Sequence, residues 1–164
     1  MAEPVRTIAV LVANPALSSI LSMVLASVPS FRVRPFESKL ALVTYMRLAP
    51  VDVVVTDFDS AAARADRVTR DLRADAAIPY RDYQVIALAS AVSPETKQLC
   101  IASGIDEVIV KPMSPKYLLE RVQSRLARRA GHGTARQPTL RRPDFSQYSN
   151  VIPLWTRERP LPTH

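Results

Sequence analysis

Five short apolar runs alternate with segments of helical character, and this alternation limits the folds that the chain can adopt. The runs cover Thr7–Val12, Phe31–Phe36, Val51–Thr56, Gln84–Ala89 and Asp106–Val110. Continuous apolar runs of about five or six residues are typical of strands that are buried on both faces. Strands that alternate with helices fold into a mostly parallel sheet with helices on both sides. We therefore predict an α/β fold with a doubly wound sheet of five parallel strands.

The segments between the runs carry the spacing and the boundary residues of helices. Apolar residues four positions apart, such as Leu17, Leu21 and Leu25, form one face of a helix. A serine followed by a proline, as in Ser93-Pro94 and Ser114-Pro115, is typical of a helix start. The predicted helices cover residues 16–28, 38–48, 61–75, 93–102 and 114–129. Residues 1–129 are therefore predicted to form one domain, and residues 130–164 a tail without regular structure.

The composition excludes several classes of protein. The chain of 164 residues has only 3 Gly and contains no glycine-rich phosphate-binding loop. A single cysteine, Cys100, excludes a disulfide framework within the chain and a multi-cysteine zinc site. Two His leave too little for a histidine metal centre or a Ser-His-Asp triad. We therefore expect the protein not to be an enzyme and to hold no metal.

A stretch without charged residues, from position 7 to position 30, could be mistaken for a signal peptide or a membrane span. Asn14-Pro15 interrupts this stretch, and the flanking Glu3 and Arg6 give it no net positive charge at its N-terminal side. A buried strand, a turn and an apolar helix explain the stretch better. We expect a cytoplasmic protein without membrane insertion.

An aspartate ends the third predicted strand, and a Lys-Pro pair follows the fifth. In doubly wound sheets, ligands collect at the carboxyl ends of the strands. Three segments with this spacing, Pro50–Asp57, Ser103–Asp106 and Val110–Pro112, resemble the receiver domain of two-component response regulators, which has the CheY-like fold. The resemblance covers residues 6–127. It implies that Asp57 stands where the family accepts phosphate, and Lys111 where the family's lysine pairs with the phosphoryl oxygens.

The chain departs from the receiver pattern at three places. Receivers place two acidic residues after the first strand, where they help to hold Mg²⁺, but Leu11–Pro15 contains no carboxylate. Asp59 is too near Asp57 in the chain to replace them. Ala89 and Val108 stand where the family has its switch serine or threonine and its aromatic residue. We therefore expect no Mg²⁺, a vestigial phospho-acceptor site, and a pseudo-receiver body that serves as a protein-docking surface.

Basic charge is concentrated in the tail. Residues 1–126 carry 15 Lys or Arg and 13 Asp or Glu, whereas residues 127–164 carry 7 Arg and only Asp144 and Glu158 as acids. All five basic residues between positions 136 and 159 are arginine, and they stand with Phe145, Tyr148 and Trp155. Arginine binds phosphate or a guanine edge through two hydrogen bonds, and aromatic rings stack on bases. This combination, with an aspartate as acceptor, favours a guanine nucleotide as ligand.

The segment Arg141–Ser146, which follows a CheY-like domain, is similar to the arginine-rich extension of the Cle family of CheY-like cyclic di-GMP effectors. The resemblance implies that the tail binds cyclic di-GMP and that the protein then docks on a flagellar motor or switch protein. Arg141, Arg142 and Asp144 would form the core of ligand recognition. The predicted ligand-binding residues are Arg136, Arg141, Arg142, Asp144, Tyr148, Trp155, Arg157 and Arg159. We expect the protein to be a monomer.

Three alternatives remain open from the sequence. The pseudo-receiver could bind protein alone, with residues 151–155 docking back on the body as an apolar clamp. Asp57 could accept phosphate as in a conventional response regulator, against which the missing acidic pair argues. The arginines could hold nucleic acid through its phosphates. No DNA-reading module is recognisable in the sequence, so we do not expect DNA as a partner.

Overall fold

The sheet of this computed structural model, which describes residues 2–131 and 151–152, is built from the five predicted apolar runs. Its parallel strands lie in the order β2-β1-β3-β4-β5, so the chain reverses its direction of travel across the sheet after β2. The strands are β1 (Arg6–Leu11), β2 (Phe31–Pro35), β3 (Val53–Asp57), β4 (Gln84–Ala89) and β5 (Glu107–Val110). The predicted doubly wound α/β sheet is confirmed.

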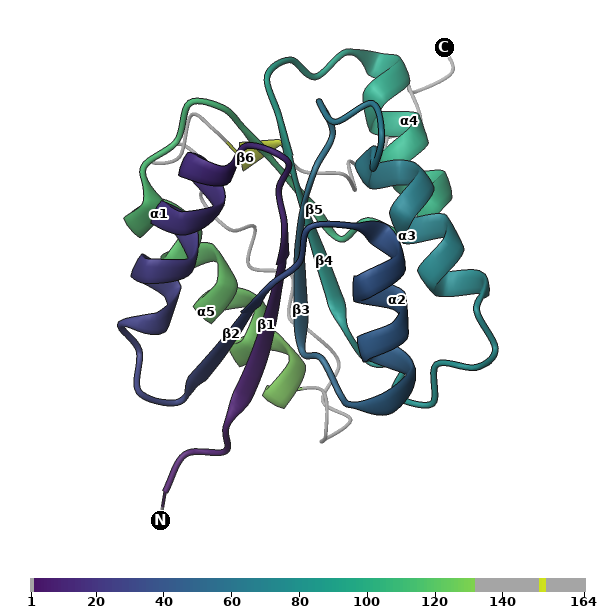
Figure 1. The fold of residues 1–164 in the computed structure, drawn as a ribbon. Helices are drawn as coiled ribbons and strands as arrows, with labels where there is room; N and C mark the ends of the chain where they lie inside the picture. The colour runs from purple at the N-terminus through teal and green to yellow at the C-terminus, as the bar shows by residue number, and fades with distance from the viewer. Residues whose placement is uncertain (1, 132–150, 153–164) are drawn as a thin grey trace, which may run out of the picture.

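Five helices cover the two faces of the sheet. Figure 1 shows α1 and α5 on one face and α2, α3 and α4 on the other. The helices are α1 (Pro15–Ala26), α2 (Lys39–Leu48), α3 (Ala65–Ala74), α4 (Pro94–Ser103) and α5 (Pro115–Gly131). None of the helices in the described ranges is long and apolar enough to cross a membrane.

The helix starts follow from short polar side chains that accept a backbone hydrogen bond. The side chains of Asn14, Ser38 and Ser93 each accept from the backbone N–H three residues further along the chain. The Asn14-Pro15 pair thus turns the chain from β1 into α1, as predicted. At the other end of α4, Gly104 has φ 88°, a left-handed conformation that glycine adopts without strain.

One helix begins later than predicted. The sequence pattern places a helix from residue 61, but α3 starts at Ala65. The loop before it is closed by the hydroxyl of Ser60, which accepts from the backbone N–H of Ala63 at 3.2 Å. Arg64 then has extended backbone angles and provides no side-chain cap. Because the side chain of Ser60 forms this hydrogen bond in the loop, the helix begins about one turn later than predicted.

The two faces of the sheet bury separate apolar cores. Successive side chains of a strand point to opposite faces, so β3 contributes to both. Val54 joins the core beneath α2, α3 and α4, whereas Val53 and Val55 join the core beneath α1 and α5. All three valines are fully buried. Among the described residues, the buried members of the two cores lie between positions 8 and 126.

The sheet has a sixth strand that the sequence analysis did not predict. Val151–Ile152 form β6, which lies antiparallel to β5 at the edge of the sheet. Ile152 is opposite Val108, and Val151 is opposite Ile109. For these two residues, the chain returns to the body after α5, in agreement with the alternative in which the 151–155 segment docks back on it.

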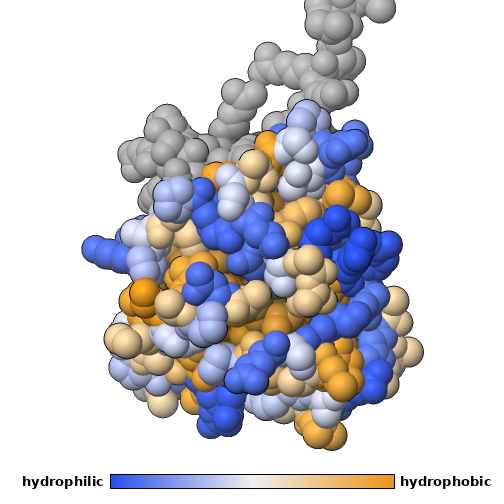
Figure 2. Space-filling view, turned by 45° about the horizontal axis from the view of Figure 1, so that its top comes forward, coloured by the Kyte–Doolittle hydropathy of each residue, from blue (hydrophilic) through white to orange (hydrophobic). Residues whose placement is uncertain are grey.

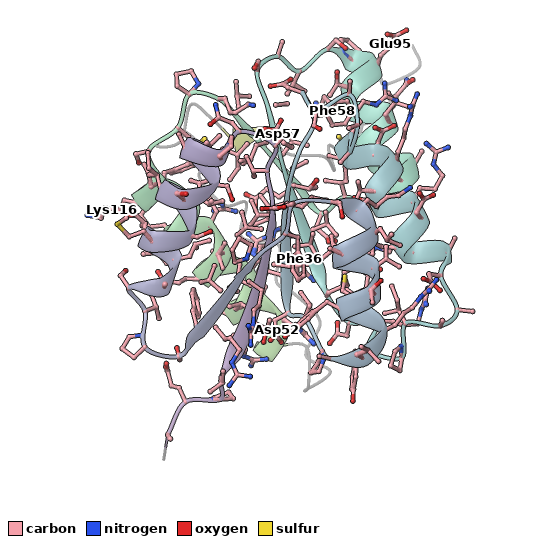
Figure 3. All side chains as sticks on the ribbon, viewed as in Figure 1. Phe36, Asp52, Asp57, Phe58, Glu95 and Lys116 are labelled. Atoms are coloured by element: carbon pink, nitrogen blue, oxygen red, sulfur yellow. The ribbon has the colours of Figure 1, made fainter. Side chains whose placement is uncertain are left out.

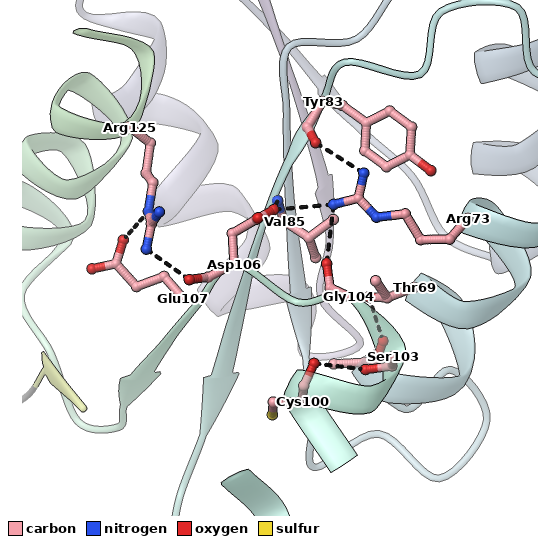
Figure 4. Close-up of polar contacts among 11 residues, drawn as sticks. Thr69, Arg73, Tyr83, Val85, Cys100, Ser103, Gly104, Asp106, Glu107 and Arg125 are labelled. Atoms are coloured by element: carbon pink, nitrogen blue, oxygen red, sulfur yellow. Dashed lines mark hydrogen bonds and ion pairs between the residues drawn. The ribbon is translucent and has the colours of Figure 1, made fainter. Parts of the chain in front are cut away.

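A buried carboxylate ties β5 to α5. Glu107 is 2% exposed and accepts hydrogen bonds from the Nε atoms of Arg121, at 2.6 Å, and Arg125, at 2.8 Å. Arg125 also donates to the backbone carbonyl of Asp106 (Figure 4). Since burying a charge without a partner is very unfavourable, the two arginines make this position of Glu107 possible.

A second polar network joins α3 to the start of β5. The guanidinium of Arg73 donates to the carbonyl oxygens of Tyr83 and Gly104 and to the carboxylate of Asp106 (Figure 4). The same carboxylate accepts from the backbone N–H of Val85 at 2.7 Å. These bonds fix the turn between α4 and β5, and with it the position of the edge strand.

Replacing Glu107 tests the first network. We expect Glu107→Ala to lower the free energy of unfolding by about 3–5 kcal/mol, because it leaves the charges of two arginines beside β5 without their partner. The matched control is Glu120→Ala on the exposed side of α5, for which we expect a change within about 0.5 kcal/mol. Urea unfolding measures both. Equal losses in the two variants would contradict this role of Glu107.

Candidate functional site

The candidate site lies where β3 ends. Asp57 is the last residue of β3 and is 4% exposed, and Figure 3 shows it at the end of the sheet where the parallel strands finish. Lys111 directly follows β5, the second strand over from β3 in the sheet. Figure 2 turns this end of the molecule toward the viewer and shows hydrophilic and hydrophobic residues interleaved on it.

The ammonium group of Lys111 contacts two aspartates. Its Nζ lies 3.1 Å from Oδ1 and 3.0 Å from Oδ2 of Asp57, so it contacts both oxygens of that carboxylate. The same Nζ lies 2.7 Å from Oδ2 of Asp59. The predicted pairing of Asp57 with Lys111 is therefore present, and Asp59 joins it.

Asp59 is held in place from three sides. Its backbone N–H donates to Oδ1 of Asp57 at 2.8 Å. Its carboxylate accepts from the hydroxyl of Ser90 at 2.5 Å and from the backbone N–H of Ser90 at 3.1 Å, in addition to the contact with Lys111. A single carboxylate thus links the loops after β3, β4 and β5.

The sequence analysis considered Asp59 only as a replacement for the acidic pair after the first strand and did not list it among the site residues. In the structure, the turn after β3 directs the carboxylates of Asp57 and Asp59 at the same ammonium. Ser90, one position beyond Ala89, also belongs to the site through its bond to Asp59. The Asp-x-Asp spacing is the signal in the sequence that points to this arrangement.

The contacts shift the proton affinities of two groups. Burial by itself would raise the pKa of Asp59, but hydrogen bonds from Lys111 and Ser90, together with the charge of Lys111, lower it below its ordinary value of 3.8. Burial would lower the pKa of Lys111, but the contacts with Asp59 and Asp57 raise it above its ordinary value of 10.5. The lysine and Asp59 therefore carry opposite charges at neutral pH.

The residues after β1 do not fit a divalent-cation site of the receiver type. Ala13 has no polar side chain, and the side-chain oxygen of Asn14 accepts from the N–H of Leu17 as the cap of α1. Asp57 and Asp59 both contact Lys111. Over residues 2–131 and 151–152, no group of three or more His, Cys, Asp or Glu could hold a metal ion.

The predicted ligand-binding residues of the tail lie outside the described residues. They are Arg136, Arg141, Arg142, Asp144, Tyr148, Trp155, Arg157 and Arg159. The structure therefore brings together Asp57 and Lys111 from the sequence prediction, and adds Asp59 and Ser90 to them.

Comparison with known proteins identifies relatives among response regulators. The chain is 30% identical over 115 residues to the DNA-binding response regulator MtrA of Mycolicibacterium smegmatis, a match that covers 70% of this chain and 48% of that protein. It is 34% identical over 88 residues to MtrA of Mycobacterium tuberculosis H37Rv, covering 54% of this chain and 36% of the relative. The chain thus spans at most about half the length of these curated relatives. No family model matches it.

Solved structures share the fold. A CheY-like receiver domain protein from Methanospirillum hungatei JF-1 superimposes with a TM-score of 0.69 at 15% identity, covering 79% of this chain and 99% of that one. The BeF3-activated DrrB receiver domain gives 0.64 at 22% identity, covering 75% and 98%. CheY4 of Vibrio cholerae gives 0.64 at 21% identity, with the same coverage of this chain and 99% of its own. Residues 2–131 therefore have the CheY-like receiver fold.

The lowered pKa of Asp59 predicts a dependence of stability on pH. Its charged form is favoured in the folded state, so its contribution is complete above pH 3.8 and is lost as the pH falls through the lower folded value. We expect wild type to be more stable than Asp59→Asn at neutral pH, and the difference to close below pH 3.8. Urea unfolding across this range measures it. A difference that stays constant with pH would contradict the contact between Asp59 and Lys111.

Proposed function

We propose that this receiver domain belongs to a signalling effector that takes its input as cyclic di-GMP bound by the C-terminal tail and then docks on a flagellar-motor protein. The observation that carries the proposal is that Ala13 has no polar side chain and the side-chain oxygen of Asn14 caps α1, at the place where the family's acidic pair would help to hold Mg²⁺. Without that ion, phosphoryl transfer to Asp57 lacks the charge neutralisation that it needs. The signal must then enter the protein at another place.

The surroundings of Asp57 oppose phosphorylation through the missing ligands for an ion. Lys111 contacts both oxygens of Asp57, and the N–H of Asp59 donates to one, but a carboxylate has about four lone-pair sites, so these contacts alone do not prevent attack. Phosphoryl transfer needs the developing charge to be neutralised, which receivers do with Mg²⁺. Ala13 and Asn14 stand where the family's acidic pair would help to hold that ion.

The tail contains side chains that can bind a guanine nucleotide, which would provide an input signal other than phosphorylation. Arg141 and Arg142 offer planar groups that bind phosphate or guanine through paired hydrogen bonds, and Asp144 can accept from a guanine edge. Residues 132–150 connect the end of α5 to β6, two elements of the body. A ligand bound between them would act on the sheet edge through its connection to β6.

The curated relatives raise the question whether the domain acts on DNA or on a protein partner. MtrA is described as a DNA-binding response regulator, but the match covers less than half of that protein. We therefore propose a protein partner, in keeping with the Cle-like order of a receiver followed by an arginine-rich tail. The alternatives are a pseudo-receiver that docks on protein without any nucleotide, and a response regulator that accepts phosphate at Asp57. Stoichiometric labelling of Asp57 by acetyl phosphate would favour the second of these.

Calorimetric titration of cyclic di-GMP into the full chain tests the proposal. We expect micromolar or tighter binding that is lost in Arg142→Ala and in Asp144→Ala, because each removes a group that recognises guanine or phosphate. Arg67→Ala, an exposed arginine of α3, is the matched control and should bind as wild type does. Asp57→Asn should also keep the affinity.

The outcomes separate the alternatives. A chain that ends at Gly131 retains the described buried residues of both cores and should fold but give no binding heat. The thermal unfolding temperatures of Arg142→Ala and Asp144→Ala should match that of wild type. Their loss of binding would then result from the lost ligand contacts and not from a loss of stability. If wild type itself gives no binding with cyclic di-GMP, and none with GTP, the proposal fails and the protein-docking pseudo-receiver stands in its place.

A further inference from the structure

Two neighbouring arginines on an edge strand have no acidic partner. β2 forms one edge of the sheet (Figure 1), and Arg32 and Arg34 are both exposed on it. Most lysines and arginines in the described part of the chain form an ion pair with a carboxylate there, but these two do not. Residues two apart on a strand point to the same face, so two positive charges lie together on this face of β2. An anionic partner would relieve their repulsion.

One of the two guanidinium groups is already held in place. The guanidinium of Arg34 lies over the ring of Tyr45 in α2, 5.9 Å from the ring centroid. That ring in turn packs against Phe36, with 5.4 Å between the two centroids. A stacked guanidinium still presents the N–H groups of its rim to an acceptor. Because the stacking orders the side chain beforehand, less conformational entropy is lost when a carboxylate binds it.

The open side of β2 also offers backbone groups to a further strand. The N–H of Phe36 bonds to β1, and the backbone groups of successive residues alternate in direction, so the N–H and C=O of Val33 point to the open side. The N–H of Phe31 already donates to the carbonyl of Val28, and Pro35 has no N–H. An extended segment can therefore pair with β2 around Val33.

The two faces of β2 differ in character. Arg34 lies on the face toward α2, whereas Phe31 and Val33 are half-buried and pack against the core beneath α1 and α5. A strand added beside β2 places its own side chains alternately on these two faces. The strand that complements β2 therefore alternates acidic residues with apolar ones.

We infer that the β2 edge is a docking surface for an extended segment of a partner protein in which acidic and apolar residues alternate. The carboxylates of this segment accept paired hydrogen bonds from Arg32 and Arg34, and its apolar side chains lie beside Val33. The arginines and Pro35 discourage pairing with an uncharged or basic strand, so they select the acidic one. A nucleic acid would neutralise the arginines but leave the apolar face unmatched. The inference does not depend on the identity of any nucleotide ligand.

A pair of charge-matched variants of the full chain tests the surface. The β2 variant combines Arg32→Gln with Arg34→Gln. The control variant combines Arg67→Gln with Lys116→Gln, which removes the same charge from exposed positions on α3 and α5. The basic tail is identical in both variants, so its attraction for acidic peptides affects both equally. Circular dichroism verifies that the variants keep the fold.

The probe is a fluorescent peptide of four Glu-Val repeats, whose binding is measured by anisotropy. We expect wild type and the control variant to bind it about tenfold more tightly than the β2 variant does, because the β2 variant loses two cross-strand ion pairs. A peptide with four Glu followed by four Val has the same composition without the alternation, and it should bind wild type more weakly. In NMR spectra, the Glu-Val peptide should shift the backbone amides of Arg32, Val33 and Arg34.

Four results would overturn the inference. Equal affinities of the β2 variant and the control variant would leave the arginines as a guard against strand pairing only. Amide shifts confined to residues outside β2 would place the peptide elsewhere on the protein. A single-stranded oligonucleotide that binds wild type more tightly than the peptide, with the same loss in the β2 variant, would assign the edge to nucleic acid. A wild-type dimer that dissociates in the β2 variant, detected by light scattering, would assign it to a second copy of this chain.

Discussion

The ammonium group of Lys111 holds together the end of the sheet at which the parallel strands finish. It lies within hydrogen-bond distance of Asp57 and Asp59, and Asp59 in turn binds Ser90. The loops after three strands of the sheet are thereby fixed to one another by charge-assisted hydrogen bonds, which are stronger than those between neutral groups. The same contacts surround the carboxylate that a receiver would phosphorylate. We propose that the body acts as a rigid platform rather than as an acceptor of phosphate.

The described residues fix β5 to the rest of the body and to the returning chain. Glu107 anchors this strand to α5, and the Arg73–Asp106 network fixes the turn that leads into it. Val151–Ile152 then return to the same strand. The basic tail therefore begins at α5 and comes back to the sheet at the strand on which α5 packs. We propose that a ligand of the tail acts on the body through this strand.

The sequence predicted the fold well because strands buried on both faces must be apolar along their whole length, as Val53–Asp57 shows up to its last residue. The pairing of Asp57 with Lys111 was also predictable, because each residue lies at the carboxyl end of a strand and these ends meet at one side of a parallel sheet. Three features of the structure could not be predicted from the sequence, each for a physical reason. The place of Asp59 depends on the turn after β3, the burial of Glu107 depends on two arginines from a distant helix, and β6 is too short to give a pattern.

The most direct test of the account is whether the carboxylate of Asp57 can bind a mimic of a phosphoryl group. Beryllofluoride, which mimics a phosphoryl group on aspartate, can be titrated with Mg²⁺ into the isotope-labelled full chain while backbone amides are followed by NMR. The account predicts that the amides of Asp57, Ser90 and Lys111 keep their positions, because the acidic pair that would help to hold the ion is missing. Saturable shifts of these three amides would contradict it and would show a working phospho-acceptor site.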